Sequence, residues 1–220
     1  MWFGSIRNRM AERLSRYGLS ATLADLAIKA INRVVVFKVL KCVRIGAPSV
    51  DYLQTATRYR CGFLDRRVLL NYSRHPQYEL PHEFVRNALA KGDECFGIMD
   101  GDVLASYGWY SNQPTDTPDG LTVHFDDKYI YMYNGFTHPD YRGQRLHAIG
   151  MTMALKEYLD RGFKGLVSTV DWNNFNSLKS VYRMGYEDFG EIYMITALGR
   201  DLIYRTRGCR DYRFALKRRQ

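Results

Sequence analysis

The stretch YIYMYNGFTHPDYRGQRLHAIGMTMALKEYL, residues 129–159, decides the fold. It opens with aromatic and β-branched residues, which favour a strand, and Pro139 ends that strand because proline has no backbone N–H to donate. Beyond Gly143 the apolar spacing changes from two residues to 3.6, which indicates a helix with one buried face. The apolar positions on this face are Leu146, Ile149, Met151, Met153, Leu155 and Tyr158.

The turn between this strand and this helix is a candidate phosphate site. The first N–H groups of a helix have no partner inside the helix, and the helix dipole adds positive potential at the same point. Arg142 and Arg145 flank the turn and add charge. Taken alone, the same letters also describe an ordinary strand-turn-helix corner with a surface Arg-Gly pair.

Residues 137–148, THPDYRGQRLHA, resemble the signature of the GNAT acyltransferase superfamily, a strand, a V-x-P-x-x-R-G turn and R/Q-x-x-G-x-G/A opening a helix. The resemblance implies that this turn cradles the pyrophosphate of coenzyme A. Arg145 and His147 stand where glycines usually stand; either their amides still face the ligand, or the usual donor binds weakly or a different acyl carrier is used. The residues implied to bind the donor are Phe136, Thr137, His138, Arg142, Gly143, Gln144, Arg145, Leu146, His147, Ala148, Asn174 and Ser177.

A second segment, residues 174–186 (NFNSLKSVYRMGY), resembles the later N-x-x-S/A…G-F/Y element of the superfamily. It follows an apolar strand at 166–170 and is typical of a short helix that Asn174 caps and Gly185 ends. The resemblance extends from about Glu79 to Tyr204. It implies an α/β (α+β) fold with a mixed, largely antiparallel central sheet, splayed around the acyl-donor site and flanked by helices.

The remaining elements follow from periodicity and turn residues. Helices are predicted at residues 5–17, about 20–31, 63–72 and 81–90. Strands are predicted at residues 33–45, 94–99, 103–110, 121–125, 192–196 and 202–205. Residues 48–57 and 111–120 are predicted to be loops, and the tail from residue 208 is predicted to extend the sheet of the last strands.

Length favours one domain over residues 1–220, which the resemblance implies is GNAT-like, and cysteine content favours a cytoplasmic protein. A chain of 220 residues can bury one good core. Its cysteines have no C-x-x-C pattern and no metal-ligand spacing, so we expect reduced thiols and no metal. They are Cys42, Cys61, Cys95 and Cys209.

Positive charge is concentrated at both ends. Residues 1–45 hold nine Lys and Arg against two acidic residues, and residues 200–220 hold eight against two. A basic helical extension (about 1–32) and a basic tail (about 207–220) suit an anionic partner such as acyl carrier protein or a membrane surface, although each end also fits a solvated face. Nucleic acid is not expected, because no binding fold of that class accompanies the charge.

Acyl transfer from a thioester requires a polarised carbonyl, a deprotonated amine and a neutralised thiolate. The resemblance places the polarising amides at the strand end that begins with Asn134, where Gly135 permits local distortion. It places an acidic tyrosine seven residues after Asn174, but that position is Val181, and Tyr182 lies about 100° around the helix. Asn134 and Tyr182 are therefore the candidate catalytic residues, and Tyr182 also fits a packed aromatic.

We expect an N-acyltransferase that moves an acyl group, with acetyl as the first candidate, from acetyl-CoA or another acyl-CoA to a small-molecule amine. A long-chain N-acyltransferase similar to an N-acyl amino acid synthase, with acyl carrier protein as donor, is an alternative. A non-catalytic acyl-CoA-binding module of the same fold is another.

Overall fold

The computed structural model describes residue 23 and residues 36–197 and 200–219. Apart from Leu23, the two predicted N-terminal helices and the basic extension of residues 1–32 lie outside the described residues.

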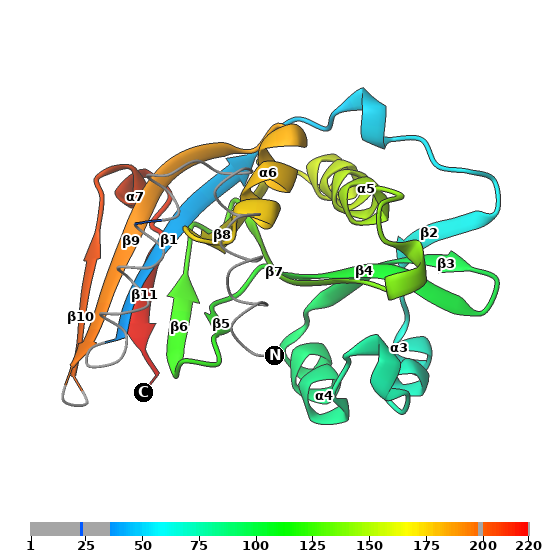
Figure 1. Ribbon diagram of the computed structural model, residues 1–220, viewed down its shortest axis with the longest axis horizontal. Coiled ribbons are helices and arrows are strands. Elements are labelled where there is room, and N and C mark those ends of the chain that lie inside the picture. The colour runs from blue at the N-terminus through cyan, green and yellow to red at the C-terminus, as the bar shows by residue number, and fades with distance from the viewer. Residues whose placement is uncertain (1–22, 24–35, 198–199, 220) are drawn as a thin grey trace, which may run out of the picture.

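An eight-stranded sheet forms the centre of the molecule, in the order β10-β9-β1-β8-β7-β4-β3-β2 (Figure 1). Its strands are β1 (Val36–Ile45), β2 (Tyr59–Phe63), β3 (Glu94–Asp100), β4 (Val103–Ser111), β7 (Ile130–Thr137), β8 (Leu166–Asp171), β9 (Glu187–Ala197) and β10 (Arg200–Arg205). Neighbouring strands are antiparallel except β7 and β8, which are parallel. The first strand lies inside the sheet, between β8 and β9.

The sheet is splayed at β7 and β8. These strands pair only at Ile130–Leu166 and Tyr131–Val167, although β7 continues to Thr137. The register between β4 and β7 also shifts at this level, which leaves Tyr133 as the extra residue of a β-bulge. In Figure 1 the strands on the β1 side and those on the β4 side consequently run in different directions. The predicted splayed, largely antiparallel sheet is confirmed.

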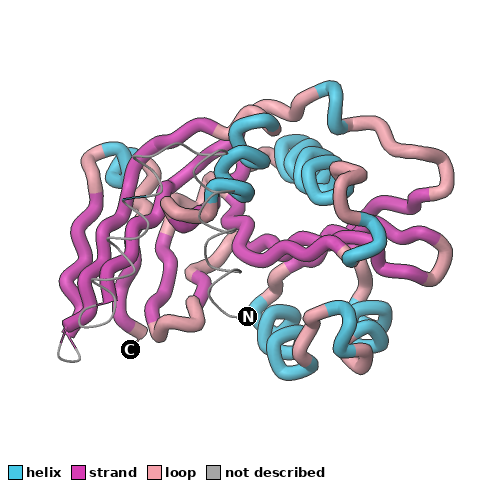
Figure 2. The backbone as a smooth tube through the Cα atoms, viewed as in Figure 1, coloured by secondary structure: helices cyan, strands magenta, loops and turns pink. Residues whose placement is uncertain are grey.

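Helices cover both faces of the β4–β7 half of the sheet (Figure 2). On one face, α5 (Leu146–Asp160) and α6 (Phe175–Arg183) bury Met151, Leu155 and Val181 against Met132. On the other face, α3 (Arg66–Tyr72) and α4 (His82–Lys91) share a second apolar cluster with β4 and β7. The one-turn helices are η1 (Val50–Tyr52), η2 (Pro76–Tyr78), η3 (Pro139–Tyr141) and α7 (Gly208–Asp211).

The C-terminal tail does not extend the last strands, so that prediction was wrong. Instead β11 (Ala215–Arg218) pairs with β6 (Leu121–His124), which also pairs with the short β5 (Thr115–Asp116). This small sheet forms because Phe214 and Leu216 bury their side chains with Val123 against the large sheet. Two strands were not predicted: β5 lies in the expected loop, and β2 precedes a helix that begins only after its cap, Asp65.

The four cysteines are free thiols, and three of them are buried. Cys42 and Cys209 bring their Sγ atoms within 3.9 Å of each other. Within the described ranges no group of three or more His, Cys, Asp or Glu is arranged to hold a metal ion. In the same part of the chain, no helix is both long and apolar enough to cross a membrane.

Candidate functional site

The turn between β7 and α5 has an irregular backbone. Gly143 has φ +83° and Arg145, the N-cap of α5, has φ +61°. The left-handed region is unfavourable for a residue with a Cβ, so the backbone at Arg145 is held there at a local cost of about 1–3 kcal/mol. Strain of this kind is often found where a backbone is shaped for a ligand.

The turn offers a row of backbone donors. The N–H of Ile149 is the first to bond within α5, to the carbonyl of Arg145, so the amides of Leu146, His147 and Ala148 have no partner inside the helix. The backbone N–H groups of residues 143–144, in the turn, form no hydrogen bond with a backbone carbonyl of the described residues. Consecutive free amides at a helix N-terminus form an anion-binding site.

A cleft of about 520 Å³ lies beside these amides. It is lined by Tyr52, Arg145, His147, Ala148, Asn176, Lys179, Ser180 and Arg183. Within the described part of the chain, Arg145, Lys179 and Arg183 form no ion pair with a carboxylate. Their charge is therefore available to an anionic ligand.

The motif in residues 174–186 did not predict which residues of α6 line this cleft. The two residues that the motif did predict, Asn174 and Ser177, cap the helix: Asn174 Oδ1 accepts the Ser177 N–H at 3.2 Å. The lining residues lie instead at 176, 179, 180 and 183. This i, i+3, i+4, i+7 spacing of polar residues marks one helix face and was readable in the sequence.

Several predicted donor residues direct their side chains away from the cleft. Arg142 donates its Nε to the carbonyl of Thr137 at 3.3 Å, and Gln144 Oε1 accepts from the Tyr59 hydroxyl at 2.6 Å. Gln144 and His138 line a different hollow, on the far side of the turn.

Two further predicted residues are packed in the protein interior. Phe136 stacks on Tyr107, and Leu146 is buried in a small apolar cluster. Leu146 and Thr137, whose hydroxyl bonds Ser106, can offer a ligand only backbone groups. The backbone groups of Phe136, like those of His138 two residues on, face β4.

The end of β7 has an open edge next to the cleft. The His138 N–H bonds to Ala105 of β4, so by the alternation of an antiparallel pair the backbone groups of Gly135 and Thr137 face the opposite edge. There β8 has already diverged. An extended ligand with amide groups can add to such an edge as a further strand would.

His147 reaches this edge from α5. A Cβ placed on Gly135 would lie 2.3 Å from His147 Cε1, so the imidazole lies directly against the Gly135 backbone. Burial lowers the pKa of His147 to about 4, which leaves the ring neutral at ordinary pH. No residue in the described ranges forms a hydrogen bond with its ring nitrogens.

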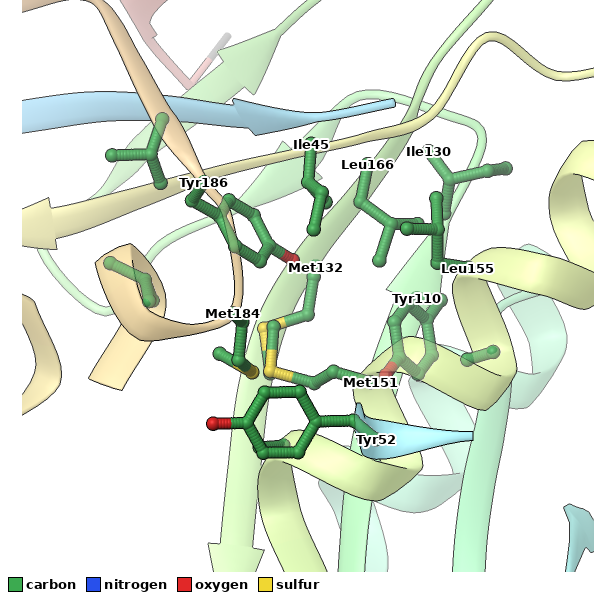
Figure 3. Packing of buried hydrophobic residues seen from close by; sticks show 14 of the residues in the cluster. Ile45, Tyr52, Tyr110, Ile130, Met132, Met151, Leu155, Leu166, Met184 and Tyr186 are labelled. Carbon is green, nitrogen blue, oxygen red and sulfur yellow. The ribbon is translucent and has the colours of Figure 1, made fainter. Parts of the chain in front are cut away.

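The core next to the point where β7 and β8 diverge consists of apolar side chains. The side chains of Met132, Met151 and Met184 lie together, with Tyr52 beside them (Figure 3). Methionine side chains are flexible and adapt to ligands of different shape.

The two candidate catalytic residues lie in different places. Asn134 is half-buried in β7, paired with Trp109 next to the bulge. Tyr182 is 43% exposed, is not among the residues lining the cleft, and donates its hydroxyl to Asp188 Oδ1 at 2.8 Å. Partial burial and this hydrogen bond raise the pKa of Tyr182 to about 12.

The fold and this site define a protein with an anion-binding turn, a basic cleft and an open strand edge on a splayed sheet. Residues 59–186 match the Acetyltransferase (GNAT) family. This match covers more than half of the chain, which therefore belongs to the GNAT acetyltransferase family. Members of the family transfer an acyl group from acyl-CoA to an amine, with acetyl-CoA as co-substrate.

Three solved structures share the fold at low sequence identity. A Drosophila protein is 12% identical with a TM-score of 0.52, over 80% of this chain and 57% of its own. A GNAT-family acetyltransferase from Colwellia psychrerythraea is 12% identical with a TM-score of 0.51, over 73% of this chain and 56% of its own. A GCN5-related N-acetyltransferase-like protein from Streptococcus suis is 16% identical with a TM-score of 0.50, over 80% and 67%.

The chain thus spans little more than half the length of the first two structures. The comparison with curated proteins found no match.

Proposed function

We propose that this chain is an N-acyltransferase that moves an acyl group, with acetyl as the first candidate, from coenzyme A to a small-molecule amine. One observation carries the proposal. Free amides and three cations that form no ion pair within the described ranges surround a cleft that adjoins the open edge of β7. A thioester whose phosphates occupy the cleft and whose pantetheine follows that edge would bring its carbonyl to the bulge beside Asn134.

The charge of the cleft favours coenzyme A over acyl carrier protein as donor. The phosphopantetheine of a carrier brings one phosphate, whereas coenzyme A adds a second phosphate in its diphosphate and a third on the ribose. The amides of the turn suffice for one phosphate. Arg145, Lys179 and Arg183 supply the further charge that a nucleotide requires.

The contacts of the basic tail favour ion pairing within the chain over docking to an acidic carrier or a membrane. Arg213, Arg218 and Arg219 each lie within ion-pair distance of an aspartate of the same chain. Exposed pairs of this kind contribute little to stability but reduce the charge that an acidic carrier or membrane would encounter.

Calorimetric titration of the chain with coenzyme A and with free 4′-phosphopantetheine tests the donor. We expect coenzyme A to bind at least about tenfold more tightly, because one additional charged contact contributes roughly 1.5–3 kcal/mol. Equal affinities would favour the carrier-dependent long-chain enzyme, and no binding of coenzyme A to the folded chain would contradict the proposal. Mass spectrometry of an amine panel with acetyl-CoA then separates an enzyme from a module that binds without turnover.

Tyr182→Phe is expected to leave turnover within about twofold of the wild type. The hydroxyl is held by Asp188 outside the cleft, and a raised pKa makes the phenol a weaker acid. General acid catalysis contributes about 10²–10⁴-fold where it operates. A loss in that range, with donor affinity and the unfolding curve unchanged, would show instead that Tyr182 protonates the thiolate.

A further inference from the structure

His147 occupies a position that neither the binding of phosphate nor the packing of the core explains. Its ring lies between the cleft and a tightly packed interior that contains Phe96, Tyr110 and Met151, against the backbone of Gly135. The thioester of a donor that follows the edge of β7 would pass this ring.

A purely structural role fits the ring poorly. The ring is half-buried at the border between the cleft and the packed interior, and an apolar side chain of similar size would fill its buried part without desolvating a polar group. The imidazole nitrogens have no partner in the described part of the chain, so the ring is poised for a partner that arrives with the ligand.

The protonation state of His147 limits what it can do. With a pKa near 4 it is neither an imidazolium acid nor an effective base at neutral pH. A neutral imidazole retains one N–H donor, and enzymes use such a group as an electrophile toward a carbonyl oxygen.

We propose that the neutral imidazole of His147 donates its ring N–H to the carbonyl oxygen of the acyl thioester and is thereby a catalytic residue. This inference rests on the proposed acyl transfer. The amine nitrogen attacks the thioester carbon, a C–N bond forms, and the carbonyl electron pair moves to the oxygen that His147 stabilises. The C=O bond then re-forms as the C–S bond breaks, and the thiolate takes up, directly or through water, the proton that the amine releases.

The first test observes the ring without requiring an acceptor. The full chain, labelled with 15N in its histidine rings, is titrated with coenzyme A and with the acetyl-CoA analogue in which a methylene replaces sulfur. That ketone retains the carbonyl but cannot transfer its acyl group. We expect the His147 ring resonance to shift clearly more with the ketone than with coenzyme A, whose phosphates bind beside the same residue, while the resonance of the exposed His75 stays unchanged in both titrations.

The second test measures the rate effect. His147→Leu keeps an apolar body but removes the donor, and loss of one such donor lowers kcat by about 10²–10³-fold. We expect that loss with the dissociation constant for acetyl-CoA within about threefold of the wild type, and no change in the matched control His75→Leu.

Two outcomes would overturn the inference while leaving the proposed function intact. One is a His147→Leu variant with kcat within threefold of the wild type or with only donor affinity lost. The other, which applies even if the variant does not fold, is a wild-type ring resonance that responds equally to the ketone and to coenzyme A. A folded wild-type chain that binds neither ligand in calorimetry would overturn both the inference and the proposed function.

Discussion

Replacing Lys179 and Arg183 together with glutamate is expected to lower the affinity for acetyl-CoA by about 10²–10⁴-fold. Both side chains line the cleft from one face of α6 and form no ion pair among the described residues. Each hydrogen bond between a cation and a phosphate is worth roughly 1.5–3 kcal/mol, and the reversed charges add repulsion. Calorimetry of the wild type and the double variant measures the difference.

The matched control is Arg66→Glu with Arg67→Glu, which changes the net charge by the same amount. These exposed residues open α3, on the other face of the sheet, where acidic residues suit the helix N-terminus. Their replacement should leave the affinity for acetyl-CoA within about twofold of the wild type. An equal loss in both double variants would mean that the donor responds to overall charge, and the cleft would lose its assignment.

The parts of the fold that were predicted are those with local causes. The hairpin of β3 and β4 turns at Gly101-Asp102, and α5 has a strong apolar face; both elements were predicted to within about a residue. The tail shows the limit of such reasoning. The alternation of Tyr212, Phe214 and Leu216 predicted a strand in the tail, but its partner is β6, about ninety residues earlier in the chain. No local pattern contains that information.

The candidate site likewise has one part that local sequence predicts and another that depends on tertiary packing. The turn and its free amides follow from a strand, a glycine and a helix in succession, and the rotation of Tyr182 away from the usual position followed from helix geometry. The proposed role of His147 could not be predicted, although the sequence has this histidine where a glycine is expected. That role depends on the contact with Gly135, which the packing of α5 on β7 creates.

Gly135→Ala is expected to destabilise the protein by about 1–3 kcal/mol, the usual cost of overpacking. Its new Cβ would lie 2.3 Å from His147 Cε1 and 3.0 Å from Met132 Cε, so the imidazole has to leave its place. Because the ring sits at the end of a side chain that can rotate, we expect a folded protein whose acyl transfer is reduced more strongly than its stability. Urea unfolding and turnover of the same preparation measure the two effects.

A double-mutant cycle with His147→Ala identifies the cause. In that background the nearest atom left to the new methyl group is Met132 Cε, the end of a flexible side chain, so Gly135→Ala should cost less than about 1 kcal/mol. The difference between the two backgrounds is the coupling free energy, expected at about 1–2 kcal/mol for residues in direct contact. Gly62→Ala in β2, where a Cβ meets nothing within 4 Å, is the control and should change stability by less than about 1 kcal/mol. Equal costs of Gly135→Ala in the two backgrounds would mean that the imidazole does not lie against β7, and the inferred contact between His147 and the thioester would fail with it.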